Sequence, residues 1–127
     1  MKNVRTYAAN CLKEEAQAIM GLIPLLDDNF DKAVEMMYSC QGKVIVTGVG
    51  KSGHIGAKIA ATLSSTGTPS FFLNPLDAYH GDLGVVTSQD IVVAISNSGQ
   101  TDELLRFVPM LIHMGIPIIG MSGNPKS

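Results

Sequence analysis

The sequence lacks the basic runs that mark most nucleic-acid-binding proteins. Its nine Lys and Arg residues are spread along 127 positions, and the net charge at neutral pH is -2. Proteins that bind DNA or RNA usually present a basic patch to the phosphate backbone. The composition therefore argues against a nucleic-acid partner, while 46% hydrophobic residues are enough for one domain with a buried core.

Long apolar runs are missing as well. No stretch approaches the ~18 apolar residues that a membrane-spanning helix needs. The N-terminal MKNVRTYAANCLKEEAQ has no apolar centre of the kind found in signal peptides, because charged and polar residues interrupt it. We therefore expect a cytoplasmic protein with no membrane partner.

Cysteine and histidine are too sparse to suggest a metal site. Cys11 and Cys40 lie far apart and match no CxxC spacing. Their helix-like surroundings favour two buried thiols. The three histidines are scattered and give no metal-ligand spacing, so we expect no metal and no cofactor.

Helical periodicity dominates the first forty residues. Apolar side chains recur three or four positions apart between Val4 and Leu22. Pro24 and the polar residues after it end this helix, and a second helix from about 30 to 40 ends before Gly42. Residues 1–41 are thus predicted to form an N-terminal helical segment, whose apolar stripe is suited to assembly.

From residue 43 onward, short apolar runs alternate with glycine-rich loops and amphipathic stretches. Strands that are apolar throughout suit a parallel sheet covered on both faces. Strand and helix in alternation predict an α/β fold with a doubly wound parallel sheet over residues 42–127. The sequence stops in a loop, GNPKS, so we expect the C-terminal part of this domain to be absent. The expected strands are 44–47, 70–73, 91–96 and 116–121, and the expected helices are 54–66 and 101–114, the latter containing Pro109.

The stretch TGVGKSGHIG, residues 47–56, is similar to two nucleotide-binding motifs. The P-loop does not fit, and the dinucleotide motif fits locally, after a strand and before a helix, but lacks its acidic partner. A P-loop needs glycine where this chain has Ile45. A dinucleotide site needs an acid at the end of the next strand, where Asn74 and Pro75 stand. What remains is a glycine-rich turn at a helix start, which attracts anions. On this loop alone, an anion site with Lys51 and a tight turn with a solvated lysine are equally compatible.

The stretch ISNSGQTDE, residues 95–103, gathers short polar side chains at the start of the next helix. Hydroxyl and N–H groups at such a place can surround a phosphate monoester without a metal. Capping by Ser98 or Thr101 is the simpler interpretation, but capping needs only one such residue. The loop has more short polar side chains than capping requires, which favours a phosphate site. In the strand order 2-1-3-4, this loop and GVGKSGH would face each other across the ligand crevice. The polar residues are Ser96, Asn97, Ser98, Gln100 and Thr101.

Four motifs together carry a resemblance to a known family. GKSGHIG, STGTPSFF, HGDLG and ISNSG follow one another between Gly50 and Gly99. Over residues 42–127 the sequence resembles the sugar isomerase (SIS) domain of arabinose-5-phosphate isomerases, the KpsF/GutQ family. The resemblance implies a flavodoxin-like three-layer sandwich that interconverts D-ribulose 5-phosphate and D-arabinose 5-phosphate through an enediol(ate). It also implies a pentose phosphate ligand, a homo-oligomer (a tetramer), and a place in Kdo synthesis for lipopolysaccharide or capsule.

The resemblance also implies roles for single residues. Lys51 and Glu103 would be catalytic, with Glu103 as acid or base, although the usual preference for acids in a first helical turn also explains Glu103. Relatives often carry a histidine linked to metal binding where this chain has Asn74, which weakens a metal interpretation. His54 is expected to serve packing or helix-start polarity. The substrate would contact Ser52, Asn97 and Gln100, its phosphate Ser96, Ser98 and Thr101, and its sugar Gly67, Thr68 and His80.

Two other functions stay open on the sequence. A phosphosugar sensor without catalysis would need the serine-rich loop but neither Lys51 nor Glu103. The isomerase half of a sugar-phosphate aminotransferase would lack the HGDLG stretch, which this sequence contains.

Members of the resembled family carry a further glutamate and histidine past the point where this sequence stops, and many carry CBS domains. We therefore expect no efficient enzyme if the polypeptide ends at Ser127.

Overall fold

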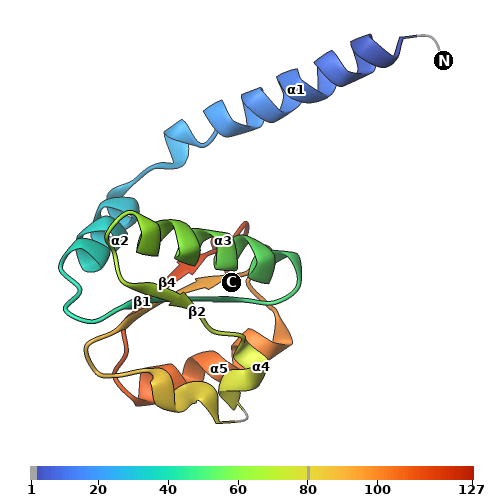
Figure 1. The fold of residues 1–127 in the computed structure, drawn as a ribbon. Coiled ribbons are helices and arrows are strands. Elements are labelled where there is room, and N and C mark those ends of the chain that lie inside the picture. The colour runs from blue at the N-terminus through green and yellow to red at the C-terminus, as the bar shows by residue number, and fades with distance from the viewer. Residues whose placement is uncertain (1–2, 80) are drawn as a thin grey trace. The chain divides into compact units, whose positions relative to one another are not determined.

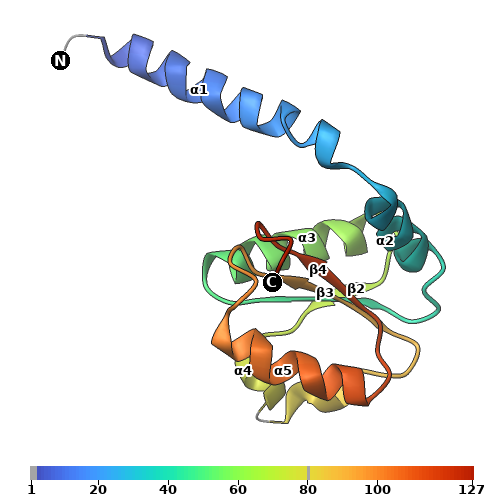
Figure 2. The same ribbon diagram turned by 180° about the vertical axis from the view of Figure 1, so that it is seen from behind.

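The structure is a computed structural model that describes residues 3–79 and 81–127, and its α-helices and strands are labelled in Figures 1 and 2. The chain divides into two compact units, Met1–Glu35 and Met36–Ser127. The division falls a few residues before the expected boundary at residue 41. The reason is that Met36, Met37 and Cys40 pack against the core of the sheet.

The first unit is helical, as the periodicity predicts. It contains α1 (Val4–Met20), the short 3-10 helix η1 (Ile23–Leu25) and the start of α2 (Asp28–Tyr38). Asp27 caps α2, because its Oδ1 accepts the N–H groups of Asn29 and Phe30 at 3.0 and 3.2 Å. No residue of α1 is buried. The expectation of two buried thiols is therefore wrong for Cys11, which is exposed, while Cys40 is half-buried.

The second unit is built on a four-stranded parallel sheet. Its strands are β1 (Val44–Gly48), β2 (Ser70–Phe72), β3 (Ile91–Ile95) and β4 (Ile118–Met121). Their order is β2-β1-β3-β4, which confirms the predicted order, and every neighbouring pair is parallel. All five residues of β1 are buried, as expected for a central strand with helices on both faces.

Helices cover both faces of this sheet, as Figures 1 and 2 show. On one face, α3 (Lys51–Ser65) packs against Val44, Val46 and Val93 through Ala60, Ile59 and Leu63. On the other face lie α4 (Pro75–Tyr79), the 3-10 helix η2 (Asp82–Val85) and α5 (Asp102–His113). Here the buried side chains of α5 meet those of β1 and β3, with Phe107 and Leu111 fully buried. The doubly wound α/β prediction is confirmed.

Two short elements were not predicted, α4 and η2. Pro75 occupies the first position of α4, where its missing N–H costs nothing. The side-chain Oδ1 of Asn74 accepts the N–H of Leu76 at 2.9 Å and so starts the helix. Such elements rest on local hydrogen bonds and carry too few residues for a periodic pattern.

The helix α3 begins at Lys51, three residues earlier than expected, and therefore includes Gly53 in addition to Gly56. A Cβ on Gly53 would lie 2.8 Å from the carbonyl oxygen of Gly48, and one on Gly56 would lie 3.1 Å from Cγ1 of Val46. Only glycine lets the helix approach β1 this closely. Close packing thus accounts for Gly53 and Gly56 without any ligand.

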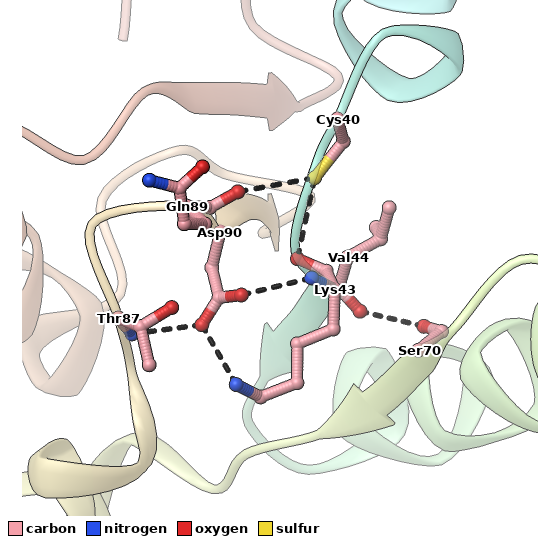
Figure 3. Close-up of polar contacts among 7 residues, drawn as sticks. All are labelled: Cys40, Lys43, Val44, Ser70, Thr87, Gln89 and Asp90. Carbon is pink, nitrogen blue, oxygen red and sulfur yellow. Dashed lines mark hydrogen bonds and ion pairs between the residues drawn. The ribbon is translucent and has the colours of Figure 1, made fainter.

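At the amino edge of the sheet, an ion pair joins the start of β1 to the start of β3 (Figure 3). The carboxylate of Asp90, 2% exposed, accepts the backbone N–H and the Nζ of Lys43 and the backbone N–H of Thr87, each at 2.8 Å. Burial alone would raise the pKa of Asp90, but these hydrogen bonds and the ammonium charge hold that pKa below its usual value. The thiol of Cys40 lies 3.5 Å from the carbonyl oxygen of Gln89.

Candidate functional site

The two polar loops singled out in the sequence leave adjacent strands at the same edge of the sheet. Gly48 at the end of β1 pairs with Ile95 at the end of β3. The loop of residues 49–50 follows β1, and the loop of residues 96–101 follows β3. The predicted meeting of the two loops is therefore confirmed at the carboxyl edge, where ligands of doubly wound folds bind.

The β1 loop leaves the start of α3 open. Gly50 has φ 63° and ψ -128°, a conformation that favours glycine, and no side chain caps the helix. The first N–H groups of a helix lack partners within it and form a ready anion site. Lys51 is the first helical residue and is exposed, and Ser52 follows it half-buried. This arrangement can receive an anion with a lysine beside it.

The β3 loop is held together by its own hydroxyl groups. Ser96, 8% exposed, accepts the N–H of Gly99 at 3.0 Å and lies 2.7 Å from the hydroxyl oxygen of Thr101. Ser98 accepts the N–H of Gln100 at 3.0 Å. Thr101 stands at the N-cap position of α5, but its side chain does not cap the helix. The capping interpretation therefore fails for Thr101, and the helix start stays open to an anion.

Glu103 lies in the first turn of α5 and is exposed. Asp102 precedes it in the same turn. The first turns of α3 and α5 start at the same edge of the sheet, so Lys51 and Glu103 lie at the same edge, on helices that follow neighbouring strands. A carboxylate and an ammonium so placed can move a proton and stabilise a developing negative charge.

A third loop lies at this edge, the one that contains GNPKS, which the sequence suggested as a loop but not as a part of the candidate site. Residues 122–127 follow β4 and lie against the serine-rich loop, because the N–H of Gly123 donates to the carbonyl oxygen of Asn97 at 2.9 Å. The side chains of Ser122 and Ser127 lie beside Gly99. A cavity of about 300 Å³ between these loops and α5 is lined by three serines and by apolar residues of β3, β4 and α5. The predicted strand order could have revealed the position of this loop. Because β4 lies next to β3, the loop after β4 begins beside the loop after β3.

Gly67 and Thr68 lie at the other end of the same unit. The 15 residues of α3 carry the chain about 22 Å from the carboxyl edge to the amino edge. There the N–H of Thr68 donates to the carbonyl oxygen of Leu63 at 2.9 Å, and Pro69 accepts the N–H of Val44. Within one copy of the chain these two residues do not join Lys51 and Glu103. His80 lies outside the described residues.

The part of the chain that the structure describes contains no group of three His, Cys, Asp or Glu side chains placed to hold a metal ion. Among the described helices, none is long and apolar enough to cross a membrane.

Comparison with known proteins agrees with this fold. Residues 37–127 match the SIS domain family. The arabinose 5-phosphate isomerase KdsD of Pseudomonas aeruginosa is 50% identical over 113 residues, which are 89% of this chain and 35% of that protein. The KdsD isomerase of Yersinia pestis is 52% identical over 116 residues, 91% of this chain and 35% of that protein. The chain thus spans about a third of the length of these curated relatives.

A solved structure resembles the whole chain. The protein c3406 of E. coli CFT073, solved in complex with arabinose 5-phosphate, has a TM-score of 0.90 and 42% identity. The match covers 100% of this chain and 69% of that one. It includes the N-terminal helical segment as well as the sheet.

Proposed function

The chain belongs to the SIS domain family, and we propose that it interconverts D-arabinose 5-phosphate and D-ribulose 5-phosphate. The observation that carries this proposal is the 42% identical E. coli structure with bound arabinose 5-phosphate, which matches the chain over its full length. The curated isomerases support it with about half of the residues identical over the matched part.

In the proposed complex the phosphate lies at the serine-rich loop. The hydroxyls of Ser96 and Thr101 bind each other and keep the loop in one shape, so the open N–H groups of the α5 start point at a fixed place. Ser98, Asn97 and Gln100 lie in the same loop and supply further polar contacts. The α3 start and Ser52 close the site from the side of β1.

The proposed chemistry is a proton transfer through an enediol(ate). Glu103 takes the proton from C2 of the open-chain aldose and returns it to C1, while the proton of the O2 hydroxyl moves to O1. Lys51 stabilises the negative oxygen that develops in between. No metal and no cofactor take part in this scheme.

The proposal includes a homotetramer in the cytoplasm. In it, Gly67 and Thr68 contact the sugar of a neighbouring copy. Their position at the amino edge, about a helix length from Lys51, supports a contribution in trans rather than in cis. The product would enter Kdo synthesis for lipopolysaccharide or capsule.

The test is NMR of D-ribulose 5-phosphate mixed with the chain in deuterated buffer. Phosphorus shifts report binding, and proton and carbon signals report arabinose 5-phosphate and deuterium at C2. If the polypeptide continues past Ser127, we expect conversion by the wild type and a loss of about 10²- to 10⁴-fold in Glu103→Gln, the usual contribution of a general acid or base.

The matched control is Glu14→Gln, an exposed carboxylate on α1, which should leave the rate unchanged. Binding without deuterium entry would leave two candidates, a sensor and an enzyme whose further catalytic groups lie past Ser127, and the same assay on a longer polypeptide would decide between them. An unchanged rate in Glu103→Gln would remove Glu103 from the chemistry.

A further inference from the structure

A second hollow lies at the carboxyl edge, between the exits of β1 and β2. Its volume is about 260 Å³, slightly below the usual range for drug-sized ligands and suited to a small polar molecule. Three glycines and Phe72 are among the residues that line it. The lining residues are Gly48, Gly50, Gly53, His54, Ala57, Phe72 and Asn74.

Two side chains give this hollow its hydrogen-bonding groups. Asn74 uses its Oδ1 to accept the N–H of Leu76, so its NH₂ is the end left for a ligand. The backbone N–H of His54 donates to the carbonyl oxygen of Gly50 at 3.1 Å, which fixes the start of its side chain. The imidazole of His54 makes no hydrogen bond to any described residue and can donate or accept.

Packing does not account for His54. The residue is exposed, so its ring contributes little to the core, and it stands one turn inside α3 rather than at the cap. The sequence-based expectation of packing or helix-start polarity therefore leaves its place on the wall of a cavity unexplained. A hydroxyl-bearing ligand in the hollow would explain it.

Resting on the proposed function, we infer that this hollow binds the hydroxyl-bearing carbon chain of the phosphosugar and that His54 contacts it directly. The exits of β2, β1 and β3 follow one another, and neighbouring strands are about 4.8 Å apart. The hollow is thus within roughly 10 Å of the serine-rich loop. One pentose phosphate spans from a phosphate at Ser96–Thr101 to a sugar beside His54.

This assignment separates the two ends of the ligand. The serine-rich loop binds the phosphate group with or without an attached sugar, while His54 forms a hydrogen bond with the sugar hydroxyl groups. Inorganic phosphate and arabinose 5-phosphate are therefore the two probes that distinguish a sugar contact from a general effect on the site.

The experiment measures the affinity of both probes by isothermal titration calorimetry. We expect His54→Ala to weaken arabinose 5-phosphate about tenfold, the effect of one lost hydrogen bond, and to leave inorganic phosphate unchanged. His54→Gln keeps a hydrogen-bonding group and should recover part of the loss. The matched control is His113→Ala, an exposed histidine in the last turn of α5, which should change neither affinity.

A second measurement follows the imidazole proton signals, assigned with the same variants. On adding arabinose 5-phosphate the His54 signal should shift while the His113 signal stays. Unchanged arabinose 5-phosphate affinity in His54→Ala, or an equal loss for both probes, would overturn the inference alone. Failure of the wild type to bind arabinose 5-phosphate would overturn the proposed function together with it.

Discussion

The two edges of one sheet differ in how their polar groups are used. At the amino edge, the Asp90 carboxylate meets three donors, and the Ser70 hydroxyl donates to the carbonyl oxygen of Val44 at 2.7 Å. At the carboxyl edge, α3 and α5 start without side-chain caps, and Lys51 and Glu103 are exposed. Side-chain and backbone groups at the first edge bind each other, whereas the helix starts at the second edge have no side-chain partner. The stabilising ion pair and the proposed site therefore lie at opposite ends of the strands.

The largest expected effect on stability comes from the amino edge. Asp90→Ala leaves the N–H groups of Lys43 and Thr87 without an acceptor and should lower the free energy of unfolding by about 2 kcal/mol. The figure stays at the low end for a broken ion pair, because the Lys43 side chain is 31% exposed and its ammonium reaches water. Urea unfolding followed by circular dichroism measures it.

The control is Asp77→Ala, an exposed acid of α4 without a hydrogen bond to any described residue through its carboxylate. It should leave stability within experimental error. Equal losses in both variants would refute the special role of the Asp90 ion pair. Conversion by Asp90→Ala, measured well below its unfolding temperature, should match the wild type.

The same ion pair predicts a pH dependence. Because the pKa of Asp90 is lowered in the folded state, the contribution of its ionised carboxylate to the free energy of unfolding is fully present above the unfolded pKa of about 3.9. The contribution is lost as the pH falls through the lower, folded pKa. Urea midpoints measured from about pH 6 down to about pH 3 should therefore fall more steeply for the wild type than for Asp90→Ala. Parallel curves would contradict the pKa direction.

The smallest expected effect is a gain. Thr47 is fully buried in β1, and its hydroxyl has no hydrogen-bond partner among the described residues. Thr47→Val keeps the shape, removes the unsatisfied hydroxyl and should raise the free energy of unfolding by about 1 kcal/mol. Thr66→Val is the contrast, because the Thr66 hydroxyl donates to the carbonyl oxygen of Thr62 at 2.8 Å. That variant should gain nothing, and a gain there but not at Thr47 would count against the account.

The framework of the fold could be predicted from the sequence because its signals are long. The apolar runs of β1 and β3 and the amphipathic α5 repeat their pattern over several residues, and parallel strands with glycine-rich exits allow few orders. The facing of residues 49–50 and 96–101 followed from that order alone.

What could not be predicted depends on single contacts. Ser96 and Thr101 were predicted as two of several phosphate-binding residues, and nothing in the sequence indicated that their hydroxyls form a hydrogen bond with each other. The starts of α3 and α4 depend on a glycine contact to Gly48 and on the Asn74 side chain, and neither has a periodic signal. The sugar-contact role of Gly67 and Thr68 was inferred from the family resemblance alone. Their position at the amino edge of the sheet was not part of that inference.

The central claim is that a phosphosugar binds at the carboxyl edge. The most direct measurement is a two-dimensional ¹H–¹⁵N spectrum of the chain titrated with arabinose 5-phosphate. We predict shifts in the amide signals of residues 50–54 and 97–103, with residues 42–44 and 87–90 unmoved. Shifts confined to residues 42–44 and 87–90, or no shifts at all, would contradict the account.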